Sequence, residues 1–79
     1  MTTLRVFIVP ENASNGEWKA QFYSDDFTKL IFEKSGSVDV QCDPLGVISE
    51  GKIWLEKNKE AIIKELKPLV NNPELIFEN

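Results

Sequence analysis

The chain contains no histidine and only one cysteine, Cys42, among its 79 residues. Without histidine, the Ser-His and Cys-His pairs that activate nucleophiles cannot form, and the imidazole ligands of most zinc and iron sites are missing. A single cysteine excludes an internal disulfide, which small secreted scaffolds need. We therefore expect a non-catalytic cytoplasmic protein that binds neither metal nor cofactor.

Long apolar runs are also missing. No segment approaches the ~20 apolar residues that a membrane-spanning helix needs. Residues 2–5 run directly into a short apolar stretch that Pro10 ends, unlike a signal peptide. The sequence predicts a soluble chain with no membrane contact.

Positive charge is in short supply. The chain has nine basic and thirteen acidic residues, so its net charge is −4 and its isoelectric point is about 4.7. Such a chain repels phosphate backbones, which disfavours direct nucleic-acid binding. The acidic excess lies mainly in residues 1–48, which hold four basic and seven acidic residues.

The composition is otherwise that of a globular protein, with 42% hydrophobic and 28% charged residues. A chain of this length supports one core, so we expect a single domain over residues 1–79. Four glycines, at positions 16, 36, 46 and 51, form no phosphate-binding loop, so no nucleotide site is predicted.

Apolar patterning in the first half predicts strands. Residues 3–9 are β-branched and aromatic and end at Pro10, and residues 17–23 alternate large apolar with polar side chains. Residues 27–33 fit either a helix or a strand, and their shortness favours a strand. A turn at residues 34–37 would then lead into a fourth strand over 38–42, which Asp43-Pro44 stops.

The second half predicts one helix over residues 50–67, with Ser49 as its N-cap and Pro68 as a kink or end. Its apolar face would comprise Leu55, Ile62, Ile63, Leu66, Leu69 and Val70. Residues 74–78 offer a last strand. The expected fold is α+β, in the order β-β-β-β-α-β, with a mostly antiparallel four- or five-stranded sheet and one helix packed on one face.

The first strand is apolar on both faces, because Leu4, Val6 and Ile8 point one way while Phe7 and Val9 point the other. One helix can cover only one face. Either the second face binds a partner, or the C-terminal strand or a loop folds over it. The predicted partner-binding residues are Phe7, Val9, Lys19, Gln21, Tyr23, Asp25, Asp26 and Trp54.

Three further features have two interpretations each. Trp54 lies about 100° around the helix from the apolar face, so it is either a binding hot spot or a residue that packs on a neighbouring loop. Cys42 is in phase with Val38 and Val40, which favours a core residue over a nucleophile. The four turn aspartates lack the spacing of a calcium loop, so solvation is favoured over cation binding for Asp25, Asp26, Asp39 and Asp43.

Residues 15–20, Asn-Gly-Glu-Trp-Lys-Ala, and 49–51, Ser-Glu-Gly, loosely resemble HicB-type antitoxins. The small β-β-β-α-β domains of that family open with a Gly-aromatic hairpin and enter their helix through Ser-x-Gly. The resemblance covers about half of the chain. The family's Pro-Gly-Cys turn is missing and residues 24–42 have no counterpart, so we assign no family from it.

Small size, acidity and the absence of a catalytic set favour a protein-interaction module that inhibits or regulates another macromolecule, as phage-encoded host-defence inhibitors, immunity proteins and antitoxins do. A basic nucleic-acid-handling protein would suit it, because carboxylates can replace phosphates. The candidate carboxylates are Glu17, Asp25, Asp26, Glu33, Asp39 and Asp43. The alternatives are an accessory subunit or homodimer without inhibitory role, and, ranked last, an enzyme that uses carboxylates alone.

Overall fold

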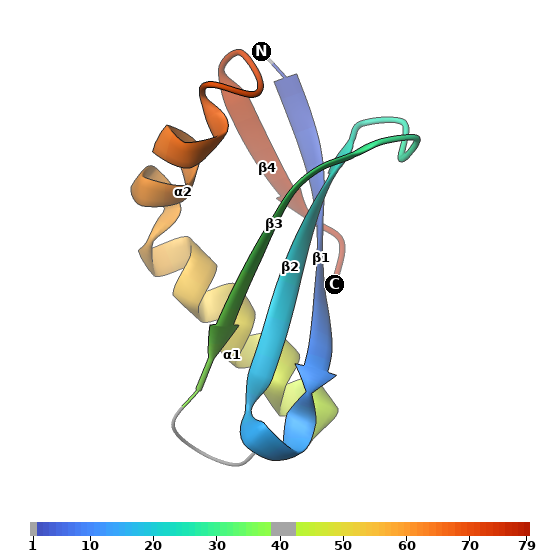
Figure 1. Cartoon of the computed structure of the whole chain (residues 1–79), viewed down its shortest axis with the longest axis vertical. Coiled ribbons are helices and arrows are strands. Elements are labelled where there is room, and N and C mark those ends of the chain that lie inside the picture. Colours follow the sequence, from blue (N-terminus) through green and yellow to red (C-terminus); the bar gives the residue numbers. More distant parts are fainter. Residues whose placement is uncertain (1, 39–42) are drawn as a thin grey trace.

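The computed structural model describes residues 2–38 and 43–79 and shows an α+β fold of four strands and two α-helices (Figure 1). A single 3-10 turn, Ala13–Asn15, joins the first two strands. The elements are β1 (Thr2–Asn12), β2 (Glu17–Ser24), β3 (Leu30–Ser37), α1 (Pro44–Lys57), α2 (Lys59–Leu66) and β4 (Pro73–Phe77).

The four strands form one mixed sheet in the order β3-β2-β1-β4. Both hairpins, β1 with β2 and β2 with β3, are antiparallel as predicted. The last strand is parallel to β1, with Thr2 opposite Pro73 and Val6 opposite Phe77, so the expectation of a mostly antiparallel sheet is wrong there. The helices cross one face before β4 begins, and such a crossover returns the chain in the direction of the first strand.

The helical segment begins earlier than predicted and is divided in two. The Asp43 side chain accepts a hydrogen bond from the Gly46 N–H at 2.7 Å, and Pro44 occupies the first helical turn, where a missing N–H costs nothing. Asp43-Pro44 therefore starts α1. Asn58 separates α1 from α2, and its side chain donates to the Trp54 carbonyl at 2.8 Å.

The third strand also differs from the prediction. It spans Leu30–Ser37 and includes the four residues assigned to a turn. The Val38 N–H donates to the Gly16 carbonyl and continues the pairing with β2. Of the predicted fourth strand, residues 39–42 lie outside the described residues, and so does the predicted role of Cys42.

Beyond the end of β4, two local features protect the outer edge of β1 from pairing with another strand. The Asn79 side chain accepts from the Ile8 N–H at 3.0 Å and donates to the Ile8 carbonyl at 2.7 Å, as a paired strand would. Pro10, two residues further on, has no N–H to leave unpaired. The strand therefore passes through Pro10, where we expected it to end, with a bulge between Val9 and Asn12.

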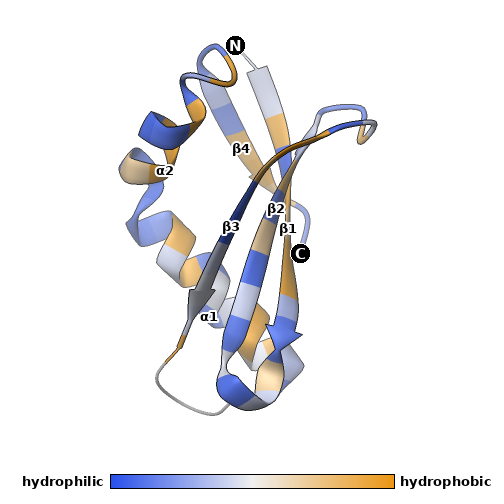
Figure 2. Ribbon diagram, in the orientation of Figure 1, coloured by the Kyte–Doolittle hydropathy of each residue, from blue (hydrophilic) through white to orange (hydrophobic). Residues whose placement is uncertain are grey.

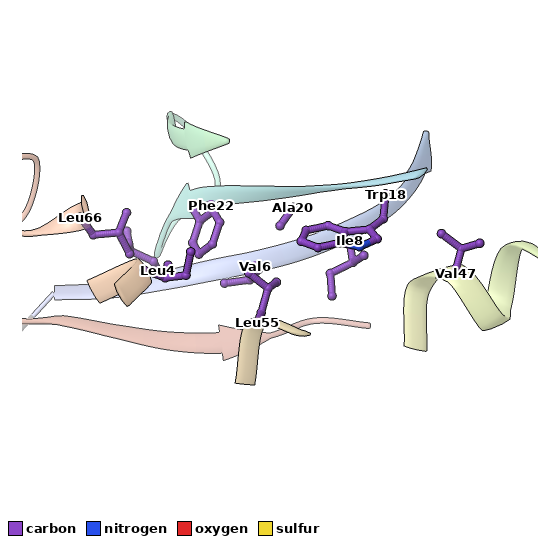
Figure 3. Packing of buried hydrophobic residues seen from close by; sticks show 10 residues of the cluster. Leu4, Val6, Ile8, Trp18, Ala20, Phe22, Val47, Leu55 and Leu66 are labelled. Atoms are coloured by element: carbon purple, nitrogen blue, oxygen red, sulfur yellow. The ribbon is translucent and has the colours of Figure 1, made fainter. Parts of the chain in front are cut away.

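The core lies between the sheet and both helices, as predicted for the inward residues of the first two strands (Figure 3). Apolar positions alternate with polar ones along β2 and the helices (Figure 2). Of the predicted helical face, Leu55, Ile62 and Leu66 are buried and Ile63 and Val70 are half-buried, whereas Leu69, beyond the end of α2, is 54% exposed. The fully buried side chains are Leu4, Val6, Ile8, Trp18, Ala20, Phe22, Val47, Leu55, Ile62 and Leu66.

Trp18 packs at one end of this core, beside Ile8 and on the side of Val47 (Figure 3), and depends on two glycines. A Cβ on Gly51 of α1 would lie 3.0 Å from the Trp18 ring, and a Cβ on Gly36, its cross-strand partner, would overlap it. The Trp54 ring packs 5.6 Å from the Trp18 ring. The close approach of β3 to the indole therefore requires glycine at position 36, whereas at position 51 of α1 a Cβ would press tightly against the ring.

We expect Gly36→Ala to lower the free energy of unfolding by about 1–3 kcal/mol, because overpacking forces a core ring out of place. Denaturant unfolding of the variant measures this loss. The neighbouring exposed Ser35→Ala is the control and should change stability little. In a Trp18→Phe background the same Gly36→Ala substitution should cost less, and an equal cost in both backgrounds would contradict the packing account.

Candidate functional site

The face of the sheet opposite the helices is covered by no element among the described residues (Figure 1). Strand alternation places the odd-numbered residues of β1 and β2 on this open face, since their even-numbered residues form the core. The open face thus brings together most of the predicted partner-binding residues: Phe7, Val9, Lys19, Gln21 and Tyr23.

An aromatic cluster occupies one end of the open face. The Phe7 ring meets the edge of the Tyr23 ring at 5.9 Å and the tilted Phe27 ring at 5.8 Å. The Arg5 guanidinium lies 5.8 Å from the centre of the Phe27 ring. Phe27 and Leu30 remain 47% and 41% exposed, so the cluster presents apolar area to solvent.

Sequence analysis missed Phe27 as a site residue. It belongs to the turn between β2 and β3 and has a φ of 63°, which is unusual for a bulky side chain. This backbone conformation holds the ring beside Phe7. The only sequence signal was a large aromatic residue directly after the turn residues Asp25-Asp26.

Each cation on the open face lies between two carboxylates. Arg5 contacts Asp25 at 2.9 Å and Glu78 at 3.1 Å. Lys19 lies 3.5 Å from Glu11 and 3.9 Å from Glu33. The two clusters contain four carboxylates and two cations, so the open face is acidic around its aromatic cluster.

The two predicted turn acids have different roles. Asp25 pairs with Arg5, whereas one Asp26 oxygen accepts from the Thr28 hydroxyl and the Ser24 hydroxyl, both at 2.7 Å, and from the Thr28 N–H at 3.1 Å. These bonds, the Thr28 hydroxyl first, lower the pKa of Asp26 from 3.8 to about 2. Asp26 therefore shapes the turn that positions Phe27.

Trp54 does not belong to the open face. Its ring packs on Trp18 of β2 on the helix side of the sheet and not on a loop, and 37% of the residue is exposed. Asp43 is the N-cap of α1, and Asp39 lies outside the described residues.

No three acidic side chains within residues 2–38 and 43–79 gather closely enough to hold a metal ion. Neither α1 nor α2 is long and apolar enough to cross a membrane. A shallow hollow of about 470 Å³ between α2 and the start of β4 is lined by Lys59, Ile63, Lys67, Asn72, Pro73 and Glu74.

Comparison with protein-family models, with curated proteins and with solved structures finds no match for this chain. The resemblance of residues 15–20 and 49–51 to HicB-type antitoxins therefore gains no support from a family model.

The Asp26 carboxylate should stabilise the β2–β3 turn above pH 4 and lose this effect as the pH falls from about 3.8 to about 2, because its pKa is lower in the folded state than in the unfolded chain. The stability difference between the wild type and Asp26→Asn, measured by denaturant unfolding, should shrink over that range. An NMR titration should give Asp26 a midpoint near 2. A midpoint near 3.8 would contradict the turn geometry.

Proposed function

We propose that this chain is a non-catalytic protein-interaction module that binds a basic partner protein through the open face of its sheet, in the cytoplasm. The observation on which this rests is the aromatic cluster of the half-buried Phe7 and Tyr23 and the exposed Phe27, flanked by the carboxylates that enclose Arg5 and Lys19. Exposed aromatic area supplies binding energy, and the carboxylates supply charge complementarity.

The acidity of the open face favours a basic partner over a second copy of the chain. Both basic side chains on this face already contact acidic ones, so a second open face would meet it with excess negative charge. Like charges brought together at an interface cost several kcal/mol. We therefore rank the homodimer through this face, and an accessory-subunit role based on it, below a basic partner.

The inhibitory or regulatory role is the part of the proposal that depends on the partner. A nucleic-acid-handling protein presents a basic groove, and an acidic face with aromatic anchors can occupy such a groove in place of phosphates and bases. Asp26 is already committed to the turn, so Glu11, Asp25, Glu33 and Glu78 are the carboxylates that we expect to face the partner.

Capture from a lysate of the source organism, with immobilised wild type and Tyr23→Ala run in parallel, tests the proposal. We expect basic proteins that the wild type retains and Tyr23→Ala loses, because truncating a central aromatic anchor costs about 2 kcal/mol or more. Ile53→Ala, on the outer side of α1, is the control and should retain them. Proteins captured equally by the wild type and Tyr23→Ala would argue against the open face.

With a captured partner purified, Glu11→Lys should slow association and weaken its salt dependence, because rim charges steer encounter and are screened over ~8 Å at physiological salt. Glu56→Lys makes the same change in net charge on the helix side and is the matched control. Surface plasmon resonance at low and high salt measures both rates. Equal effects of the two substitutions would show that net charge, and not the open face, governs binding.

A further inference from the structure

The two edges of the sheet differ in how well they are protected from pairing with another strand. On the other side the edge strand β4 has only five residues and begins with Pro73, and the part of β1 beyond it is covered by the Asn79 side chain and Pro10. The β3 edge has no proline between Leu30 and Val38, and β3 is the strand nearest the viewer in Figure 1, with no described element in front of it. An uninterrupted eight-residue edge strand is a template for pairing with another strand.

The backbone groups that β3 offers outward can be identified. Val38 donates to Gly16, and hydrogen-bonded pairs recur at every second residue of an antiparallel ladder. The even-numbered residues of β3 from Phe32 to Gly36 therefore face β2. Glu33, Ser35 and Ser37 point their N–H and carbonyl groups away from the sheet.

The side chains of β3 select among the registers of a symmetric antiparallel pair. A two-fold axis at Glu33 or at Lys34 would place like charges directly opposite each other, which destabilises a pair. An axis at Gly36 would place the charged Lys34 opposite the apolar Val38, which form no favourable cross-strand pair. An axis at Ser35 opposes Lys34 to Gly36, Glu33 to Ser37 and the half-buried Phe32 to the half-buried Val38.

We propose that two copies of this chain pair through β3 in antiparallel orientation, with Ser35 on the two-fold axis, to form a continuous eight-stranded sheet. Both helical layers then lie on one side, and both open faces lie on the other. This pairing uses the β3 edge and shares only Glu33 with the proposed partner site. It can be tested on the purified chain alone.

Ser37 is the position that tests the register, because it would lie opposite Glu33 of the second copy at two symmetric places. Ser37→Lys should tighten the dimer about fivefold and Ser37→Glu should weaken it about fivefold, given the modest energy of a cross-strand ion pair. The double variant Glu33→Lys/Ser37→Glu exchanges the two charges of that ion pair and should dimerise about as tightly as Ser37→Lys. Sedimentation equilibrium measures the dissociation constants, and thermal unfolding checks that each variant is folded.

Ser35→Pro tests the edge independently of charge. It removes an outward N–H that β2 does not use, so the monomer should stay folded while dimerisation is lost, and Ser35→Ala should dimerise normally. A chain that is monomeric at high micromolar concentration would overturn the proposal. So would a dimer that responds equally to Ser37→Lys and Ser37→Glu, or one that Phe7→Ala dissociates and the Ser37 substitutions leave unchanged.

Discussion

The packing of Trp18 is the interaction on which the rest of the structure depends. Its ring is fully buried between β3 and α1, where Gly36 and Gly51 allow both backbones to approach it. Burial of a ring this large is one of the main favourable terms available to so short a chain. The indole Nε1 finds no hydrogen-bond partner among the described residues, so burying the ring carries the free-energy cost of an unpaired polar group.

The same packing explains why one face of the sheet stays open. Both helices are used to cover the face that Trp18 and Phe22 present, and residues 2–38 and 43–79 contain no further element to form a third layer. The open face is instead ordered by its own cross-strand contacts, such as the edge-to-face pair of Phe7 and Tyr23. Exposed ion pairs add at most about 1 kcal/mol each, so these contacts orient side chains more than they stabilise the fold.

Sequence patterns were sufficient for features that depend on local alternation. The first two strands, the inward phase of Leu4 to Ile8 and the outward phase of Phe7 and Val9 all follow from a period of two, and the structure confirms them. Periodicity likewise placed Leu55, Ile62 and Leu66 on the inner side of the helical segment. The candidate site was therefore predictable as a surface, though not in its details.

The errors arose where a residue's role depends on contacts that the alternation of apolar and polar residues does not encode. Gly36 was interpreted as a turn residue because its partner Trp18 lies on another strand, and Pro10 was interpreted as a stop because the closing Asn79 lies at the far end of the printed sequence. Asp43-Pro44 is ambiguous in isolation, since the same pair can end a strand or cap a helix. Phe27 was missed because its positive φ depends on hydrogen bonds made by Asp26.

The charges of the open face matter through their arrangement more than through their sum. Because Arg5 and Lys19 are each held between two carboxylates, neither is free to contact an acidic partner, and every arriving cation meets carboxylates with spare acceptor capacity. An arginine of a basic partner could share Glu11 or Glu33 with Lys19 without breaking an existing pair. In the proposed complex the carboxylates would select for basic groups, and contact with the aromatic cluster would determine how long the partner remains bound.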